Sequence, residues 1–192
     1  MPRIYLLRHA KPAAAWGDDP DPGLDPLGAT QATAVAQHLA KAIACGPVYT
    51  SPLRRCRETA QPLCALWQCA ATVLPAVAEV PSPPMDSAAR RAWLTAAMRG
   101  TWRELHEQAP PGSIDYLQWR RRVVDALLAM PHDCVIYTHY IAINVAVGAA
   151  QERDEVLCFR PDHASVTVFE TAVGRLRLVE LGREAATDVL TR

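Results

Sequence analysis

Two histidines in this sequence each follow directly on an apolar run. Arg8 and His9 come after "IYLL" at 4–7, and His139 comes after "CVIYT" at 134–138. A guanidinium stays charged and matches phosphate oxygens in bidentate pairs. A neutral imidazole can attack phosphorus when its second nitrogen is held by a hydrogen bond. These residue types therefore indicate an anion-handling centre that contains a nucleophile.

Two arginines and a glutamate follow other apolar runs in a similar way. Arg54 and Arg55 come soon after the short run "VYT" at 48–50, and Glu79 follows "TVLPAVA". Fixed cations stabilise the charge that builds on a transferred phosphoryl group. A nearby carboxylic acid can protonate the leaving alkoxide and later accept a proton from water. Together with the histidines, these side chains favour phosphoryl transfer.

Each of these residues also has an alternative interpretation. A histidine after a strand is commonly a polar end residue, and "RRCRE" at 54–58 fits a solvated helix face. Metal binding by His9, His139 and Glu79 is a further alternative, which the adjacent arginines oppose because they would repel a cation. The clustering of all these groups favours a joint role, and we expect neither a metal nor a cofactor.

The elements that must position these groups alternate between strands and helices. The apolar runs at 4–7, 48–50 and 134–138 predict buried strands. Asp25 followed by Pro26 predicts a helix start, and the apolar periodicity that follows runs to about Ile43. Such alternation favours a largely parallel α/β sheet, in which ligands lie beyond the carboxyl ends of the strands. The polar groups named above would therefore meet at one edge of the sheet.

Further elements follow from apolar periodicity and turn residues. We expect a short strand in "TVLPAVAEV", and Pro62 should kink or divide the helix in which it lies. Gly100 is a weak point of a predicted helix, and Ser113 is the predicted cap of the next one. The predicted helices span 51–67, 86–108, 114–130 and 140–150, and a closing hairpin pairs 164–170 with 175–181.

Composition limits the class of protein. The 192 residues, half of them hydrophobic, suffice for one domain over 1–192 with a substantial core. Twenty basic and twenty acidic residues cancel, so the chain lacks the electrostatic footprint of a nucleic-acid binder. The six cysteines show no C-x-x-C pair, and the longest later apolar stretch, 140–150, is too short to span a bilayer. We expect a reduced, cytoplasmic protein without nucleic-acid or membrane partners.

Five segments of the chain resemble, in order, the histidine phosphatase superfamily of phosphoglycerate-mutase-like proteins. They are "LLRHAKP", "LDPLGATQA", "YTSPLRRCRETA", "VIYTHYIAI" and "ASVTVFE", and the least similar part is 84–125. The resemblance implies a three-layer α/β fold, with a mostly parallel central sheet and helices on both faces. It also implies a helical insertion on the substrate side, around 84–112.

The resemblance also implies roles for single residues. His9 would be the nucleophile that becomes phosphohistidine, with Arg8 beside it on the phosphoryl oxygens. Arg55 aligns with the second arginine of the family, because it precedes Cys56, where the family usually has alanine. His139 would be the second phosphate-binding histidine.

The acid and the substrate contacts are less closely matched. Glu79 stands where the family has its acid–base carboxylate, but "VPSPPMDS" follows it instead of the usual Gly-x-Trp-Glu-Gly run, which makes Asp86 the alternative. Ala10 replaces the glycine of the usual Arg-His-Gly signature. Tyr140 replaces the glycine that often follows the second histidine, and it is a candidate substrate contact together with Lys11.

The sequence thus predicts a phosphatase that hydrolyses a small phosphomonoester through phosphohistidine. A phosphoglycerate-type mutase and a phosphohistidine protein phosphatase are the enzyme alternatives. A catalytically weak phosphate-binding regulatory module is the alternative from another class. Trp93 and Trp102 are expected to pack in the core or, failing that, to contact an organic group of the substrate, and His163 has no assigned role.

Overall fold

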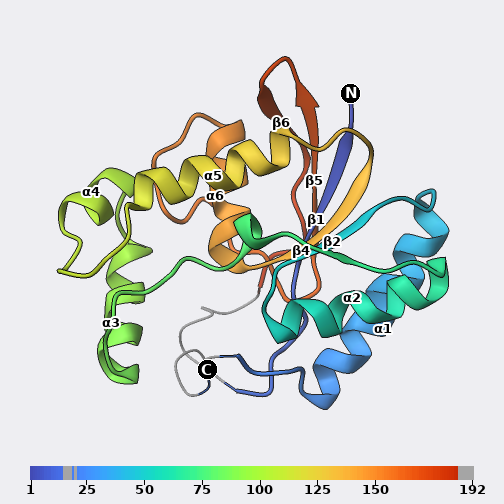
Figure 1. The fold of residues 1–192 in the computed structure, drawn as a ribbon, viewed down its shortest axis with the longest axis horizontal. Coiled ribbons are helices and arrows are strands. Elements are labelled where there is room, and N and C mark those ends of the chain that lie inside the picture. The colour runs from blue at the N-terminus through green and yellow to red at the C-terminus, as the bar shows by residue number, and fades with distance from the viewer. Residues whose placement is uncertain (15–18, 20, 186–192) are drawn as a thin grey trace.

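A mixed six-stranded sheet lies at the centre of the computed structural model, which describes residues 1–14, 19 and 21–185 (Figure 1). The strand order is β3-β2-β4-β1-β5-β6. The first four of these strands run parallel to one another, and β5 and β6 are antiparallel to their neighbours. The strands are β1 (Arg3–Arg8), β2 (Val48–Thr50), β3 (Thr72–Val73), β4 (Cys134–Thr138), β5 (Val166–Ala172) and β6 (Arg175–Glu180).

Helices cover both faces of this sheet, which confirms the predicted three-layer α/β fold (Figure 1). One face carries α1 and α2, and the other carries α5 and α6. None of the described helices is long and apolar enough to cross a membrane. The helices are α1 (Pro26–Ala42), α2 (Arg54–Trp67), α3 (Ser87–Ala97), α4 (Trp102–Glu107), α5 (Tyr116–Leu128) and α6 (Tyr140–Ala150), with a 3₁₀ turn η1 (Pro75–Val77) after β3.

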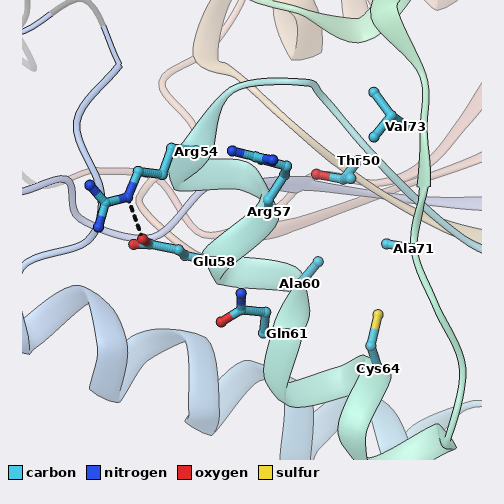
Figure 2. A pocket seen from close by; sticks show the side chains of 9 residues that line it. All are labelled: Thr50, Arg54, Arg57, Glu58, Ala60, Gln61, Cys64, Ala71 and Val73. Carbon is cyan, nitrogen blue, oxygen red and sulfur yellow. Dashed lines mark hydrogen bonds and ion pairs between the residues drawn. The ribbon is translucent and has the colours of Figure 1, made fainter.

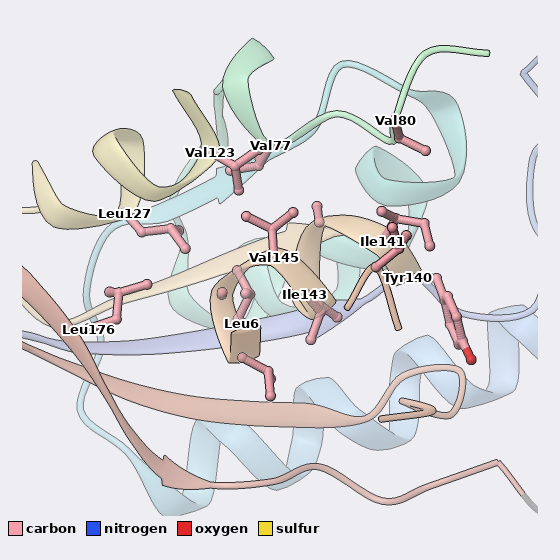
Figure 3. Packing of buried hydrophobic residues seen from close by; sticks show 14 of the residues in the cluster. Leu6, Val77, Val80, Val123, Leu127, Tyr140, Ile141, Ile143, Val145 and Leu176 are labelled. Carbon is pink, nitrogen blue, oxygen red and sulfur yellow. The ribbon is translucent and has the colours of Figure 1, made fainter. Parts of the chain in front are cut away.

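The two faces of the sheet are buried in two separate cores because side chains alternate along a strand. Leu6 of β1 packs with Val145 of α6 and Leu127 of α5 (Figure 3). The next residue, Leu7, belongs to the second core, where it packs with residues of α1 and α2 such as Leu39. Strands buried on both faces explain why the predicted runs are continuously apolar.

The predicted start of α1 is confirmed, whereas Pro62 does not divide α2. The Asp25 side chain caps α1 by accepting a hydrogen bond from the Gly28 backbone N–H at 2.6 Å. Helix α2 runs unbroken through Pro62. Ala60 and Leu63, on either side of the proline, are both buried in the second core, and this packing outweighs the backbone hydrogen bond that proline removes.

The helix predicted over 86–108 is two helices, α3 and α4, separated at Gly100. Thr101 begins α4 with a capping box, since its side chain accepts from the Glu104 N–H and the Glu104 carboxylate accepts from the Thr101 N–H at 2.8 Å. Trp102 of α4 is fully buried, which confirms that it packs in the core, and Trp93 packs beside that core with part of its surface exposed.

Two further boundaries differ from the sequence prediction. Asp115 caps α5 by accepting from the Gln118 N–H at 2.8 Å, and Ser113 instead donates its hydroxyl hydrogen to the Pro110 carbonyl. Strand β3 has only two residues, because η1 follows almost at once. The predicted hairpin is confirmed, and it turns at Val173 and Gly174, both with positive φ.

Candidate active site

Three parallel strands end side by side and bring the predicted polar residues to one edge of the sheet. Arg8 pairs with Thr138 across β1 and β4, and Thr50 pairs with Tyr137 across β2 and β4. The residues that follow these strand ends therefore lie next to one another. His9 donates its backbone N–H to the Thr138 carbonyl at 2.9 Å, which extends the ladder by one residue.

His9 is buried and held in one tautomer. Its Nδ1 lies 2.8 Å from the Ala10 carbonyl oxygen, which can only accept, so Nδ1 carries the proton. Nε2 is then left with its lone pair. Burial, reinforced by the neighbouring His139 ring and the Arg8 charge, holds the pKa of His9 well below 6.5. The ring is therefore a neutral imidazole at neutral pH, as a nucleophile must be.

His139 lies beside His9, with 5.2 Å between the ring centroids. The Arg55 guanidinium lies 3.2 Å from its Nδ1, and because arginine only donates, Nδ1 is the acceptor. The other nitrogen, Nε2, donates to the Ser51 hydroxyl oxygen at 2.7 Å. Burial lowers the pKa of His139 well below 6.5, with the Arg55 and Arg8 charges acting in the same direction.

The two arginines of the site are buried and differ in their partners. Arg8 donates to the Pro161 carbonyl at 2.9 Å and lies over the Tyr140 ring, 4.8 Å from its centroid. Its Nε is buried and has no hydrogen-bond partner among the described residues. Burial lowers the pKa of Arg8 to about 10, so it stays charged at neutral pH. Tyr140 is thus placed against Arg8 rather than at a distance from the site.

Arg55 and its neighbour Arg54 on α2 differ in exposure and in partners. The Arg55 side chain is 10% exposed and that of Arg54 is 60% exposed. Arg54 pairs with Glu58 at 2.6 Å, whereas the Arg55 guanidinium reaches His139 and lies 4.0 Å from the Asp21 carboxylate. The structure therefore brings Arg55, and not Arg54, to the histidines.

Glu79 reaches the same edge from the segment after η1. Its buried carboxylate accepts two backbone hydrogen bonds. One comes from the Val80 N–H at 3.0 Å, and the other comes from the Ile141 N–H, at the start of α6, at 3.2 Å. Burial raises the pKa of Glu79 above its ordinary value, against the opposing effects of these N–H groups and of Arg55. A carboxyl group of this kind can hold a proton for a leaving alkoxide.

These side chains form a buried cationic cluster with two neutral imidazoles and a carboxyl group. The histidine phosphatase superfamily (branch 1) model matches residues 4–184. The chain belongs to the histidine phosphatase superfamily. None of the curated proteins compared with it matches its sequence.

Solved structures of several phosphatases have a similar fold. A mycobacterial glucosyl-3-phosphoglycerate phosphatase with inorganic phosphate superposes with a TM-score of 0.74 at 24% identity, over 98% of this chain and 100% of that one. A phosphoserine phosphatase from Entamoeba histolytica superposes with a TM-score of 0.71 at 19% identity, over 94% of this chain and 96% of that one. A putative alpha-ribazole-5'-P phosphatase from Escherichia coli superposes with a TM-score of 0.73 at 15% identity, over 97% of this chain and 98% of that one.

Within this histidine phosphatase fold, the other predicted site residues lie at the margin or outside. The Lys11 ammonium pairs with the Asp25 carboxylate at 2.8 Å. Asp86, the alternative acid, is exposed and caps α3 by accepting from the Ala89 N–H at 2.8 Å. Of the two candidate carboxylates, only Glu79 is placed beside the arginines.

Sequence reasoning missed three residues that the structure brings to the histidines: Ser51, Cys56 and His163. The Cys56 sulfur lies 3.3 Å from Nε2 of His139. Ser51 holds His139, and it follows β2 directly, so the rule that selected Arg8 could have found it. His163 lies with its ring centroid 5.8 Å from that of His9. No group of three or more His, Cys, Asp or Glu residues in the described ranges is arranged to hold a metal ion.

A separate concavity lies along α2, and no histidine lines it (Figure 2). Its volume is about 390 Å³, and it contains none of the predicted catalytic or phosphate-binding residues. Arg57 lines it with an exposed side chain, and the Arg54–Glu58 ion pair closes one side. The remaining lining residues are Thr50, Ala60, Gln61, Cys64, Ala71 and Val73.

Proposed function

We propose that this protein hydrolyses a small phosphomonoester through a phosphohistidine formed on Nε2 of His9. The observation that carries the proposal is the hydrogen bond from His9 Nδ1 to the Ala10 carbonyl, which leaves the Nε2 lone pair free beside two buried arginines. A buried neutral imidazole next to fixed cations suits attack on a phosphate dianion, because the cations offset the charge of the anion.

In the first half-reaction, the Nε2 lone pair of His9 forms a bond to phosphorus as the ester P–O bond breaks. Glu79 gives its proton to the leaving oxygen, and its raised pKa favours the protonated form that this step needs. The guanidiniums of Arg8 and Arg55 hold the equatorial oxygens, where charge builds in the transition state. The Nε of Arg8, which no described residue binds, is one donor available for them.

In the second half-reaction, water attacks the phosphorus of phosphohistidine while the Glu79 carboxylate accepts a proton from that water. The N–P bond breaks and its electron pair returns to Nε2, so His9 is again neutral and inorganic phosphate is released. The Ala10 carbonyl keeps the ring in place through both steps, since it binds the nitrogen that does not react.

His139 contributes to anion binding once a dianion lies beside it. In the free site its Nδ1 accepts from Arg55. A bound dianion favours the protonated imidazole, in which both nitrogens donate. Nδ1 then donates to a phosphoryl oxygen, while Nε2 stays on Ser51.

We favour hydrolysis of a small molecule over the alternatives because similar structures belong to phosphatases named for small phosphorylated molecules. Two of those described above are a glucosyl-3-phosphoglycerate phosphatase and a phosphoserine phosphatase. We expect the segment 84–112 to border the organic part of the substrate. All six cysteines are free, which fits a reducing, cytoplasmic setting. We expect neither a metal nor a cofactor to take part.

The test is hydrolysis of an aryl phosphate by the purified protein in EDTA, with His9→Ala as the paired variant. We expect steady turnover in EDTA, acid-labile labelling of the wild type by ³²P substrate, and neither in His9→Ala. Activity that requires added metal, or that survives His9→Ala, would contradict the proposal. Labelling of His9 without turnover would indicate the regulatory module, and transfer of the phosphoryl group to a second alcohol would indicate a mutase.

A further inference from the structure

A third histidine flanks the proposed nucleophile. The His163 ring centroid lies 5.8 Å from that of His9 and the rings are tilted by 51°, close to the 5.2 Å and 58° between His9 and His139. His163 belongs to the loop between α6 and β5. His9 thus lies near two imidazoles, only one of which has a part in the proposed function.

The loop that carries His163 is fixed to the end of β1 by several hydrogen bonds. Arg8 donates its backbone N–H to the Ser165 carbonyl at 3.2 Å and its guanidinium to the Pro161 carbonyl at 2.9 Å. Ala164 donates back to the Arg8 carbonyl at 3.2 Å, and it does so with φ at +54°, a conformation that costs a non-glycine residue energy. The His163 ring is therefore placed against His9 by a loop of fixed geometry.

The outer side of this loop is equally well fixed, but through groups other than the His163 ring. The Asp162 N–H donates to the Arg183 carbonyl at 2.8 Å, and the Arg183 guanidinium donates to the Asp162 carboxylate at 3.0 Å. His163 takes part only through its backbone N–H and carbonyl. No described residue forms a hydrogen bond with its ring nitrogens, so they are available to a ligand.

The environment keeps this ring neutral. Burial lowers the pKa of His163 to about 3, with the Arg8 charge acting in the same direction and the Asp162 carboxylate opposing it. Lys11 and Asp25, which pair with each other, act on it more weakly and in opposite directions. A neutral imidazole presents one N–H donor and one acceptor, and it adds no charge to a pocket that already holds two arginines.

We propose that His163 is a ligand of the transferred phosphoryl group and donates its ring N–H to an oxygen that Arg8 also holds. The inference rests on the proposed function, because it requires phosphorus at Nε2 of His9. A phosphorus atom there carries its equatorial oxygens sideways, within reach of a ring whose centroid is 5.8 Å from that of His9. The Nε of Arg8, which has no hydrogen-bond partner among the described residues, is a second donor, and the Arg8 guanidinium is bound to the Pro161 carbonyl in the loop that carries His163.

This role predicts a particular kinetic signature. A contact to an equatorial oxygen exists in the substrate complex, the transition state and the product complex alike, and a neutral donor, unlike the arginines, gains little from the charge that builds in the transition state. Its loss therefore raises KM and the dissociation constant of inorganic phosphate together and leaves kcat nearly unchanged. If His163 only packed against His9 and kept that ring in place, its loss would lower kcat instead.

The test compares His163→Phe, which keeps a flat ring without polar atoms, with His163→Gln, which keeps an N–H donor without the ring. We expect His163→Phe to weaken phosphate binding and raise KM by about tenfold or more, as for loss of a hydrogen bond to a charged group. We expect His163→Gln to stay within about threefold of wild type, with kcat within about threefold in both. Phosphate affinity is measured by calorimetry and KM with an aryl phosphate.

Near-normal phosphate affinity in His163→Phe would overturn the proposal, as would a fall in kcat with phosphate affinity unchanged. His38→Phe and His38→Gln, at an exposed position of α1, are the matched controls. If the Phe variant does not fold, the wild type is titrated with phosphate by NMR, and the ring resonances that His163→Gln removes must shift. Calorimetry requires no turnover, so failure of the proposed function would appear as absent hydrolysis with phosphate binding still dependent on His163.

Discussion

The carboxyl edge of the sheet and the helical segment 84–112 differ in where their polar side chains lie and in what those side chains contact. At the edge, the polar groups of His9, His139 and Glu79 are buried, and their pKa values are all shifted in the direction of the neutral form. In the segment, the polar side chains of Asp86 and Glu104 are exposed and cap helices. Burial of an ionisable group disfavours folding unless the group is well partnered, so the edge retains these residues at some expense in stability.

This difference indicates where substitutions should affect activity and where they should affect only the fold. A buried group beside the nucleophile acts on reacting atoms, whereas a cap acts on the backbone next to it. Matched pairs of residues, one from each environment, therefore separate the two effects.

The largest expected effect comes from Glu79→Gln, with Asp86→Asn as its counterpart in the segment. Loss of a general acid should lower kcat/KM, which reports the formation of phosphohistidine and not its hydrolysis, roughly 10²–10⁴-fold for an alkyl phosphate, and less for p-nitrophenyl phosphate, whose leaving group needs no proton. Asp86→Asn should stay near wild type, because asparagine also caps helices. Rates on both substrates give the result. Equal losses on the two substrates in Glu79→Gln would argue against its acid role.

A smaller but still large effect is expected from Arg55→Ala, with Arg57→Ala as the control on the same helix. Removal of one fixed donor from the phosphoryl oxygens should lower kcat/KM by about 10²–10³-fold, by analogy with loss of an oxyanion donor. Arg57 is exposed and lines the separate concavity, so its loss should change kcat/KM little (Figure 2). Similar losses in the two variants would mean that general surface charge, and not the clamp, binds the substrate.

The part of the site that follows parallel strands was predictable from sequence. Arg8, His9 and His139 come directly after apolar runs, and parallel strands bring their carboxyl ends to one edge. His163 was not predictable in this way because β5 is antiparallel to β1. The amino end of β5 therefore lies at the site, and the residues that matter precede the strand.

The fold shows the same limit of local reasoning. The cap at Asp25 depends on adjacent residues only, and it was predicted correctly. The continuity of α2 through Pro62 depends on packing against the second core, which no local pattern reveals. Lys11, although close to the signature residues in sequence, pairs with Asp25 instead of joining the arginines.

The smallest expected effect is on stability, and it follows from the buried histidines. The folded pKa values of His9 and His139 lie well below 6.5, the ordinary value that they regain on unfolding. Below pH 6.5 these histidines are therefore protonated in the unfolded chain but stay neutral in the folded chain. As pH falls, the free energy of unfolding should decrease by about 1 kcal/mol per pH unit for each histidine. Glu79 has the opposite effect on stability, because its pKa is raised in the folded chain. As pH falls toward 4.5, the folded chain binds a proton at Glu79 before the unfolded chain does, which raises the free energy of unfolding.

Urea unfolding between pH 7 and pH 5 measures this dependence. The double variant His9→Asn, His139→Asn removes both imidazoles and should reduce the slope, leaving the contribution of His163, whose pKa is lowered to about 3. Glu79→Gln should steepen the slope. The helical segment offers the contrast, since Asp86→Asn leaves these buried groups in place and should keep the wild-type slope. If the double variant kept the wild-type slope, the histidines would not be the groups whose burial opposes folding at this edge.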